Sequence, residues 1–181
     1  MQQNSSEEIV IRNAIPEDAT GITEVLYKTW LATYPNKELG ITEQDIEKSF
    51  EKSFTPESIN SLAKKIGSDL PNEKRLVATY GSKVVGVATM VRNEDNNQLR
   101  TIYVLPEFQG KGIGKMLWQE AKKFCDPNKD TIVEVATYSQ NTIEFYKKLG
   151  FVDTGKRLSD MSWGIKENGV SIPEMEMVLS N

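Results

Sequence analysis

The sequence predicts a mixed α/β (α+β) fold, and three observations lead to that fold class. Segments with the apolar period of a helix alternate with β-rich segments along the 181 residues. Hydrophobic residues make up 38% and charged residues 27% of the chain, which is typical of a globular protein. The length is sufficient for one hydrophobic core. We therefore expect a single domain over residues 1–181, in which the polar residues 1–7 form a disordered tail.

The first half of the chain is predicted to form a strand, three helices and a hairpin. Pro16 suits the first turn of the first helix, and Thr42 and Thr55 each suit the N-cap of a further helix. Gly81 and Ser82 separate two β-rich segments and predict a hairpin turn. The expected ranges are 8–13 for the strand, 15–30, 42–54 and 55–67 for the helices, and 76–80 and 83–91 for the hairpin strands.

The second half is predicted to alternate between strands and helices and to close with two strands. A β-rich segment leads into a glycine loop, and a segment of helical period follows that loop. Asn141 is expected to cap the next helix, with Glu144 three residues later, and Gly150 to end it. The expected ranges are 98–105, 131–137, 151–154 and 174–179 for strands, and 113–124 and 141–149 for helices.

The glycine loop carries the clearest functional signal in the sequence. Gly110, Gly112 and Gly114 alternate between a strand that ends at Pro106 and the start of a helix. Glycines let a backbone come close to a ligand, and the free amides at a helix N-terminus attract an anion. We therefore predict that this loop binds phosphate groups. Lys115 stands where the dinucleotide fingerprint G-x-G-x-x-G needs a glycine, and the P-loop pattern is absent.

Three segments of the chain resemble those of the GNAT superfamily of N-acetyltransferases. Residues 109–114, Gln-Gly-Lys-Gly-Ile-Gly, are similar to its acetyl-CoA signature, which is a glutamine or arginine followed by x-x-G-x-G. Residues 103–106, Tyr-Val-Leu-Pro, resemble the strand that precedes this loop in the family. Residues 141–151, Asn-Thr-Ile-Glu-Phe-Tyr-Lys-Lys-Leu-Gly-Phe, are similar to the segment N-x-x-A-x-x-F-Y-x-x-x-G-F, from which they depart at Glu144 and in having three residues, not five, between the asparagine and the Phe-Tyr pair.

This resemblance implies a GNAT-like fold and acetyl-CoA as co-substrate. The fold would be a central mixed, mostly antiparallel sheet with a splayed pair of parallel strands, flanked by helices. The reaction would be acetyl transfer to a primary amine by direct attack in a ternary complex, with no metal. The cofactor-binding residues that it implies are Ile102, Tyr103 and Val104 beside the pantetheine arm and Gln109, Gly110, Lys111, Gly112, Ile113, Gly114 and Lys115 around the diphosphate.

Tyr146 is the residue predicted to act as catalytic acid. The tyrosine at this position of the family's motif hydrogen bonds or protonates the departing thiolate, and a phenol can do so within hydrogen-bond reach. Simple packing of its ring beside Phe145 and Leu149 is the structural alternative. Asn141 has two possible roles as well, since it can bind the pantetheine arm or only cap its helix.

The general base is less clear, because the chain contains no histidine. Many relatives carry a glutamate on the strand before the glycine loop, whereas residues 98–101 include no carboxylate. Glu134, between Val133 and Val135, is the predicted substitute. A salt bridge from Glu134 to Arg100 is the competing interpretation, since an unpaired carboxylate is rarely buried. A chain of water molecules is a third route for the proton.

Acceptor binding is assigned to residues near the first helix and before the last strand. Trp30 and Tyr34 are predicted to line the acceptor pocket, and the loop with Asp160 and Trp163 is a second candidate. Cys125 is the single cysteine, so no internal disulfide can form. It lies at the far end of its helix from the glycine loop, which argues against a covalent acyl-cysteine route.

The overall charge and hydropathy limit the partners that we expect. The net charge of −4 disfavours nucleic acid, and it suits either a cationic acceptor or simple solubility. The longest apolar run is too short to cross a bilayer. We expect a cytoplasmic protein that acts on a small-molecule or peptide amine, with a homodimer left open. Alternatives are a non-catalytic acyl-CoA-binding sensor, a nucleotide-binding redox enzyme and an interaction module with a degenerate site.

Overall fold

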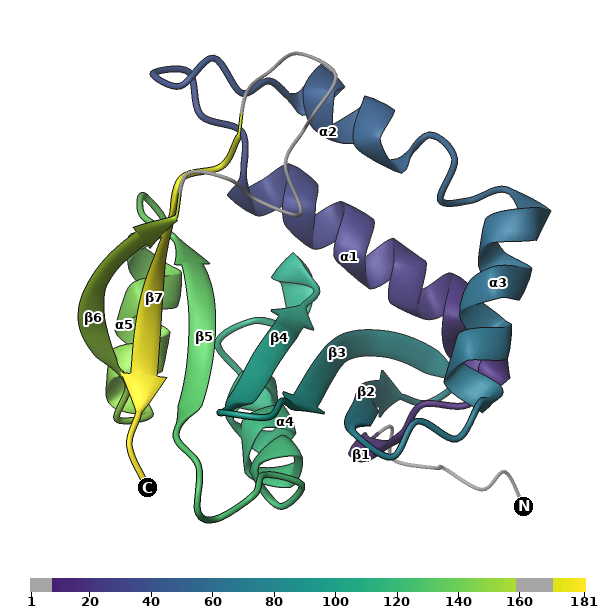
Figure 1. Cartoon of the computed structure of the whole chain (residues 1–181). Coiled ribbons are helices and arrows are strands. Elements are labelled where there is room, and N and C mark those ends of the chain that lie inside the picture. Colours follow the sequence, from purple (N-terminus) through teal and green to yellow (C-terminus); the bar gives the residue numbers. More distant parts are fainter. Residues whose placement is uncertain (1–7, 159–170) are drawn as a thin grey trace.

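Figure 1 shows a computed structural model of the chain, which describes residues 8–158 and 171–181. Seven strands form its sheet: β1 (Ile9–Asn13), β2 (Glu73–Tyr80), β3 (Lys83–Arg92), β4 (Asn97–Val104), β5 (Thr131–Ala136), β6 (Val152–Leu158) and β7 (Glu174–Leu179). Five α-helices accompany them: α1 (Ala19–Thr33), α2 (Glu43–Phe50), α3 (Pro56–Gly67), α4 (Ile113–Lys122) and α5 (Gln140–Lys148). Short 3-10 turns precede α1 at Pro16–Asp18 and α4 at Pro106–Phe108.

The sheet has the strand order β1-β2-β3-β4-β5-β7-β6. Neighbouring strands are antiparallel except β4 and β5, which are parallel. This parallel pair joins over only two positions, Asn97 with Thr131 and Gln98 with Ile132, and the two strands then separate (Figure 1). The expected fold class, a mostly antiparallel mixed sheet with a splayed parallel pair, is therefore confirmed.

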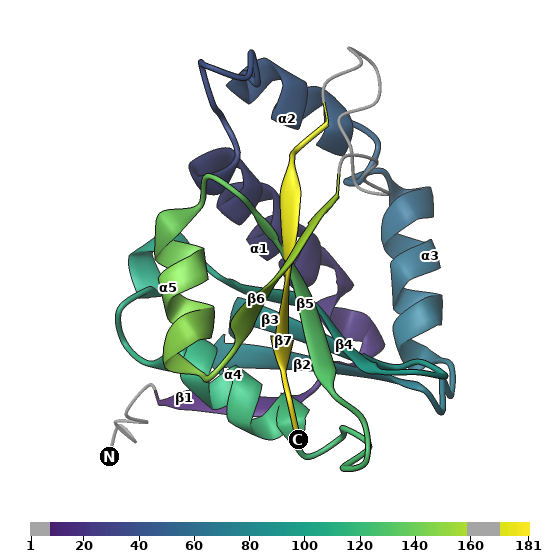
Figure 2. The same cartoon turned by 60° about the vertical axis from the view of Figure 1, so that its left-hand side comes forward.

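Helices cover both faces of the sheet. On one face α1 packs across β3 and β4, while α2 and α3 lie beside α1 (Figures 1 and 2). On the other face α4 packs against β1 to β4, and α5 lies behind β6 and β7 in Figure 1 and to the left of them in Figure 2. Both faces of β3 are consequently buried, as its apolar sequence Val84 to Val91 requires. None of the helices in residues 8–158 and 171–181 is long and apolar enough to cross a membrane.

Most of the expected helices and strands are present. Two of the predicted N-cap residues are correct, and one is wrong. Thr42 and Thr55 cap α2 and α3 by accepting hydrogen bonds from the amides of Asp45 and Ser58. The prediction that Asn141 caps α5 is wrong, because the N-cap is Ser139 and Asn141 is the second helical residue. The amide of Ile143 donates to the Ser139 carbonyl at 3.0 Å, so the first turn closes two residues earlier than expected.

Some boundaries also differ from the sequence predictions. Strand β2 begins at Glu73, three residues early, because Glu73 to Arg75 continue the antiparallel register with β3. Helix α2 ends at Phe50, and turns follow it to residue 54, where Phe54 packs edge-on against Tyr27. The predicted tail at 1–7 and the acceptor candidates Asp160 and Trp163 lie outside the described residues.

Candidate active site

The glycine loop joins β4 to α4 and leaves open space around two of its glycines. Gly110 and Gly112 adopt φ values of 74° and 80°, a region that favours glycine, and a Cβ on either would meet no atom within 4 Å. Gly114 has a different role, since its Cβ would lie 3.3 Å from the ring of Phe145 on α5. Helical hydrogen bonding begins with the amide of Met116, so the preceding amides of α4 are free to bind an anion.

A cavity of about 550 Å³ runs between this loop and α5. It is lined by Ile102, Val104, Phe108, Gln109, Gly110, Gly112, Ile113, Gly114, Lys115, Asn141, Thr142, Phe145, Lys148 and Leu149. Thus Asn141, although it is no cap, faces the predicted cofactor loop. Lys111 is not among the lining residues, because its Nζ donates to the carbonyl of Glu107 at 3.1 Å and lies over the ring of Phe108. A contact between Lys111 and a phosphate remains a prediction.

The opening between β4 and β5 forms a second, narrower cavity of about 110 Å³. Its base is fixed by the fully buried side chain of Asn97, which donates to the carbonyls of Asp126 and Lys129 and accepts from the amide of Asp126. The amide of Leu105 donates to Val85 on β3. Because bonding direction alternates along a strand, the amides of Ile102 and Val104 face the opening instead. The Val104 carbonyl accepts from Gln109 Nε2 at 2.9 Å, which ties the loop to this strand.

Tyr146 lines this narrow cavity from α5. Its side chain is 4% exposed, and its ring packs against Phe145 and Phe151. Burial is the main cause that raises the pKa of Tyr146, so the hydroxyl keeps its proton at neutral pH. Its hydroxyl makes no hydrogen bond to the residues that the structure describes. The buried hydroxyl of Ser139 in the same cavity also lacks a partner among them.

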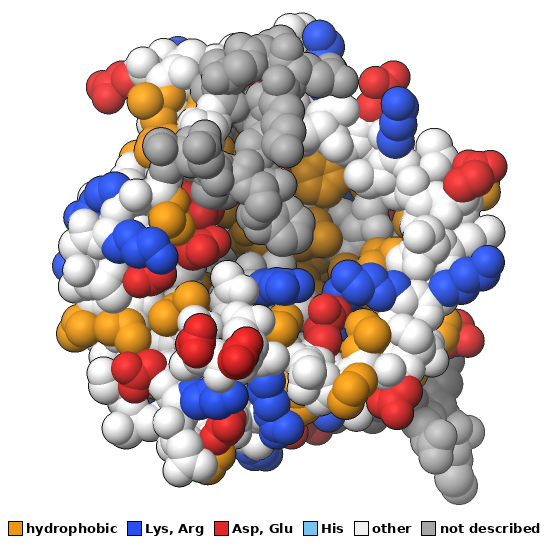
Figure 3. All heavy atoms as spheres, viewed as in Figure 1, with side chains coloured by type: hydrophobic (Ala, Val, Ile, Leu, Met, Phe, Trp, Pro, Cys, Tyr) orange, Lys and Arg blue, Asp and Glu red, His pale blue; other side chains and the backbone are white. Residues whose placement is uncertain are grey.

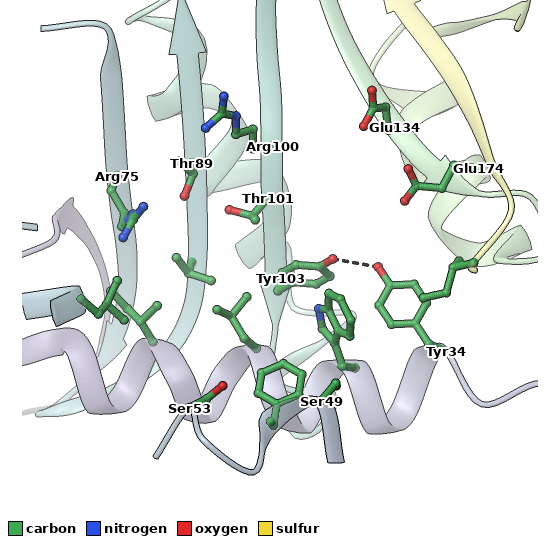
Figure 4. A pocket seen from close by; sticks show the side chains of 17 residues that line it. Tyr34, Ser49, Ser53, Arg75, Thr89, Arg100, Thr101, Tyr103, Glu134 and Glu174 are labelled. Atoms are coloured by element: carbon green, nitrogen blue, oxygen red, sulfur yellow. Dashed lines mark hydrogen bonds between the residues drawn. The ribbon is translucent and has the colours of Figure 1, made fainter. Parts of the chain in front are cut away.

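A third cavity, of about 450 Å³, lies between the sheet and the helices α1 to α3. Trp30 and Tyr34 both line it, so the structure brings the two residues predicted for acceptor binding to one site. Apolar side chains of the helices form one wall, and polar side chains of the strands form the other (Figure 4). Figure 3 shows this hollow from outside, with hydrophobic side chains at its bottom and basic side chains along one edge.

Five residues line both the narrow cavity and this larger one: Tyr34, Arg100, Thr101, Tyr103 and Glu134. Within this junction the hydroxyls of Tyr34 and Tyr103 lie 2.7 Å apart and share a hydrogen bond (Figure 4). Burial raises the pKa of both phenols, so they remain neutral donors and acceptors near pH 7. The junction is therefore a polar passage between the predicted cofactor side and the predicted acceptor side.

Glu174 on β7 is the site residue that the sequence analysis missed. Its side chain is 7% exposed, lines the acceptor cavity and has an Oε2 atom without a partner among the described residues. In the β5–β7 register it lies opposite Ala136, on the same face as Glu134 and Glu176. Burial, and then the negative charge of Glu134, raises the pKa of Glu174 to about 7. Two carboxylates thus face the cavity from neighbouring strands (Figure 4).

The alternative in which Glu134 pairs with Arg100 is wrong. Arg100 lies at a bulge of β4, where the register with β3 shifts between Thr89 and Met90. Its ion pair is with Glu73 on β2, at 3.9 Å, and no ion pair of Glu134 is found within residues 8–158 and 171–181. Glu134 therefore makes no ion pair in the described part of the chain, although its charge helps to raise the pKa of Lys156, and it stands at the junction of two cavities.

Comparison with known proteins agrees with this architecture. Residues 31–179 match the sequence profile of a family described as an acetyltransferase (GNAT) domain. An uncharacterized N-acetyltransferase of Methanocaldococcus jannaschii is 39% identical over 56 residues, which are 30% of this chain and 25% of that protein. The chain thus matches only a quarter of the length of this curated relative.

Solved structures resemble the whole chain in fold. The PaiA N-acetyltransferase of Thermoplasma acidophilum, in complex with coenzyme A, has a TM-score of 0.73 at 23% identity and covers 96% of this chain and 99% of that one. YncA of Salmonella typhimurium, solved with its cofactor acetyl-CoA, has a TM-score of 0.64 at 23% identity and covers 96% and 94%. A GNAT acetyltransferase of Streptococcus pneumoniae has a TM-score of 0.68 at 22% identity and covers 95% and 99%.

Proposed function

The chain belongs to the GNAT acetyltransferase family, and we propose that it transfers an acetyl group from acetyl-CoA to a primary amine. The observation that carries this proposal is the continuity of three cavities. The cavity at the glycine loop shares Ile102, Val104, Gln109 and Thr142 with the narrow one between β4 and β5. The narrow one shares its junction residues with the acceptor cavity. A cofactor and an amine entering from opposite sides would meet at this junction.

The residues present fit acetyl-CoA at the first two cavities. The free amides at the start of α4 and the open space at Gly110 and Gly112 suit a diphosphate. The amides of Ile102 and Val104 suit an extended pantetheine arm, which would pair with β4 as an added strand does. Lys115 adds a positive charge at the same cavity. Acetyl-CoA supplies the activated acetyl thioester when it is bound.

The chain's own groups would handle the protons of the reaction. The amine nitrogen bonds to the acetyl carbon, the carbon–sulfur bond breaks, and the amine proton moves to the carboxylate pair Glu134 and Glu174. A base with a pKa near the working pH is the most effective, and Glu174 has that property. The Tyr146 hydroxyl hydrogen bonds or protonates the departing thiolate. An amide of β4 stabilises the negative charge that develops on the acetyl oxygen.

Two measurements test this proposal. Acetyl-CoA at 100 times its dissociation constant should stabilise the purified protein by about 2.7 kcal/mol in a melting experiment, and NADH should stabilise it much less. Thiol release in the presence of a panel of amines should then identify acceptors. Binding without release would favour the non-catalytic acyl-CoA sensor, and a preference for NADH would contradict the proposal. A cytoplasmic location and a homodimer remain predictions.

A further inference from the structure

The acceptor cavity has opposite charges at its two ends. Four charged residues of the described chain line it, and they come from four strands. Arg75 on β2 and Arg100 on β4 lie toward one end, while Glu134 on β5 and Glu174 on β7 lie toward the other (Figure 4). The passage to the narrow cavity opens between Arg100 and Glu134, which both line it, and the role of Glu134 in the proposed base places the reacting amine at the carboxylate end.

The basic end is built by the strand register. Arg75 lies opposite Thr89, and Thr89 lies opposite Thr101, so these three side chains share the face that lines the cavity. The bulge in β4 adds Arg100 to the same wall, next to Thr101. Two guanidinium groups share one carboxylate, Glu73, at 2.7 Å from Arg75 and 3.9 Å from Arg100. Together these three groups carry a net charge of about +1.

Polar atoms at this end have unused bonding capacity. Arg100 carries five N–H donors, yet its side chain makes no hydrogen bond to the described residues and contacts Glu73 only at ion-pair distance. The hydroxyl of Thr101 is buried and has no partner among the same residues. An anionic group of a ligand would satisfy both, because guanidinium and hydroxyl groups donate hydrogen bonds to carboxylate oxygens.

The distance between the two ends sets the size of such a ligand. Arg100 stands on β4, which has separated from β5 at the level of Glu134, and Arg75 stands two strands beyond Arg100, at about 4.8 Å per strand, so the basic groups begin one widened strand spacing away from Glu134. The wall opposite the strands is mostly apolar and includes Leu26, Trp30 and Phe50, with Ser49 and Ser53 among them. A ligand that bridges the ends therefore needs an apolar body between its two polar groups.

On the basis of the proposed acetyl transfer, we propose that the acceptor is an amine with an apolar body and an anionic group at its far end. Glu134 and Glu174 receive the amine, Trp30 and Phe50 contact the body, and Arg100 with Thr101 binds the anion. The same arrangement disfavours a polyamine, because its second cation would face the two arginines.

Three probes with one common ring test this inference: para-(aminomethyl)benzoate, para-(aminomethyl)benzamide and para-xylylenediamine. Their far groups are anionic, neutral and cationic, and the reacting aminomethyl group is the same. We expect kcat/KM, measured by thiol release from acetyl-CoA, to be at least ~10-fold higher for the carboxylate than for the amide, since a charged hydrogen bond is gained. The diamine should be poorer still. Homologues with two methylene groups between the ring and the far group test which ligand length the cavity accepts.

Variants of the protein test whether Arg100 causes the preference for the carboxylate probe. In Arg100→Gln the ratio of kcat/KM for carboxylate over amide should fall toward one, and in Arg100→Glu the diamine should become the preferred substrate. Lys123→Gln removes one exposed positive charge at the end of α4 and should keep the wild-type ratio. Melting curves and the acetyl-CoA stabilisation serve as folding controls.

The outcomes separate this inference from the proposed function. If thiol release shows that the amide or the diamine is used as well as the carboxylate probe or better, the inference of an anionic acceptor would be overturned. The proposed acetyl transfer would then still stand. An unchanged ratio in Arg100→Gln would overturn it as well. If no probe causes thiol release although acetyl-CoA stabilises the protein, the result would count against both the anionic acceptor and the proposed acetyl transfer.

Discussion

Replacing Glu174 with glutamine removes one carboxylate of the proposed base and keeps the shape of the side chain. In the wild type, protonation of Glu174 near pH 7 should lower kcat/KM roughly tenfold per pH unit below that value. Glu134 alone remains in Glu174→Gln. The inflection near pH 7 should therefore disappear from the pH–rate profile.

The size of the effect follows from the raised pKa. Glu174 is shifted from 4.5 to about 7 by burial and by Glu134, so the pair accepts a proton ~300-fold more favourably than an ordinary carboxylate. Because the rate constant follows only part of the change in base strength, kcat/KM above pH 7 should fall by between ~10-fold and 300-fold. The profiles of wild type and variant should converge as the pH falls toward 5, where Glu174 is protonated in the wild type.

The assay is thiol release with the best amine of the panel, from pH 5 to 9. Glu176→Gln is a matched control, because Glu176 lies two residues along the same face of β7 and is paired with Lys156 at 2.8 Å. It should keep the wild-type profile. Glu134→Gln removes the like charge beside Glu174 and should move the inflection to lower pH. A wild-type rate and inflection in Glu174→Gln would refute the assignment of Glu174 as part of the base.

Three further predictions concern Tyr146, the glycine loop and stability. Tyr146→Phe should reduce the transfer rate constant by roughly 10²–10⁴ with an unchanged melting curve, and full activity would reduce Tyr146 to a packing residue. Gly112→Asp should abolish the stabilisation by acetyl-CoA, whereas Gly112→Asn, which tolerates the same positive φ without charge, should retain more of it; equal losses would implicate strain instead of charge. Glu174 binds a proton more tightly folded than unfolded, so the wild type should lose up to ~3 kcal/mol of unfolding free energy as the pH rises from about 4.5 to above 7. In Glu174→Gln this loss should be absent from denaturant titrations, and an identical pH dependence in both proteins would contradict the raised pKa.

The sequence predicted the fold and the strand, glycine loop and helix start of the predicted cofactor site because their signals are local. A strand, three alternating glycines and a helix start lie within a dozen residues, and each glycine has its own geometric reason. Gly110 and Gly112 need positive φ, and Gly114 allows Phe145 to approach α4. Trp30 and Tyr34 were predicted to line the acceptor pocket from their place at the end of the first helix, and both line the cavity between the sheet and α1 to α3. Contact of these residues with substrates remains a prediction.

The acceptor side could not be read from the sequence, because it depends on register between distant strands. Arg75, Arg100 and Glu174 are far apart in the chain and come together only through the order β2-β3-β4-β5-β7. The bulge that directs Arg100 toward Glu73 has no glycine or proline to mark it. Glu174 alternates with Met175 along its strand, a pattern that ordinarily describes a solvent-facing carboxylate.

Glu174 departs from the rule that a carboxylate is either exposed or paired, and this departure points to a function in the cavity. A buried carboxylate with an unpartnered oxygen destabilises a fold unless a ligand or a proton compensates for it. Here the charge that acts on Glu174 is that of another carboxylate, Glu134, which raises the energetic cost of ionisation. A glutamine at this position would fold with less penalty. The stability that the chain gives up at neutral pH is therefore best explained by chemistry in the cavity, where a cationic amine would pair with both carboxylates and a base of raised pKa would take its proton.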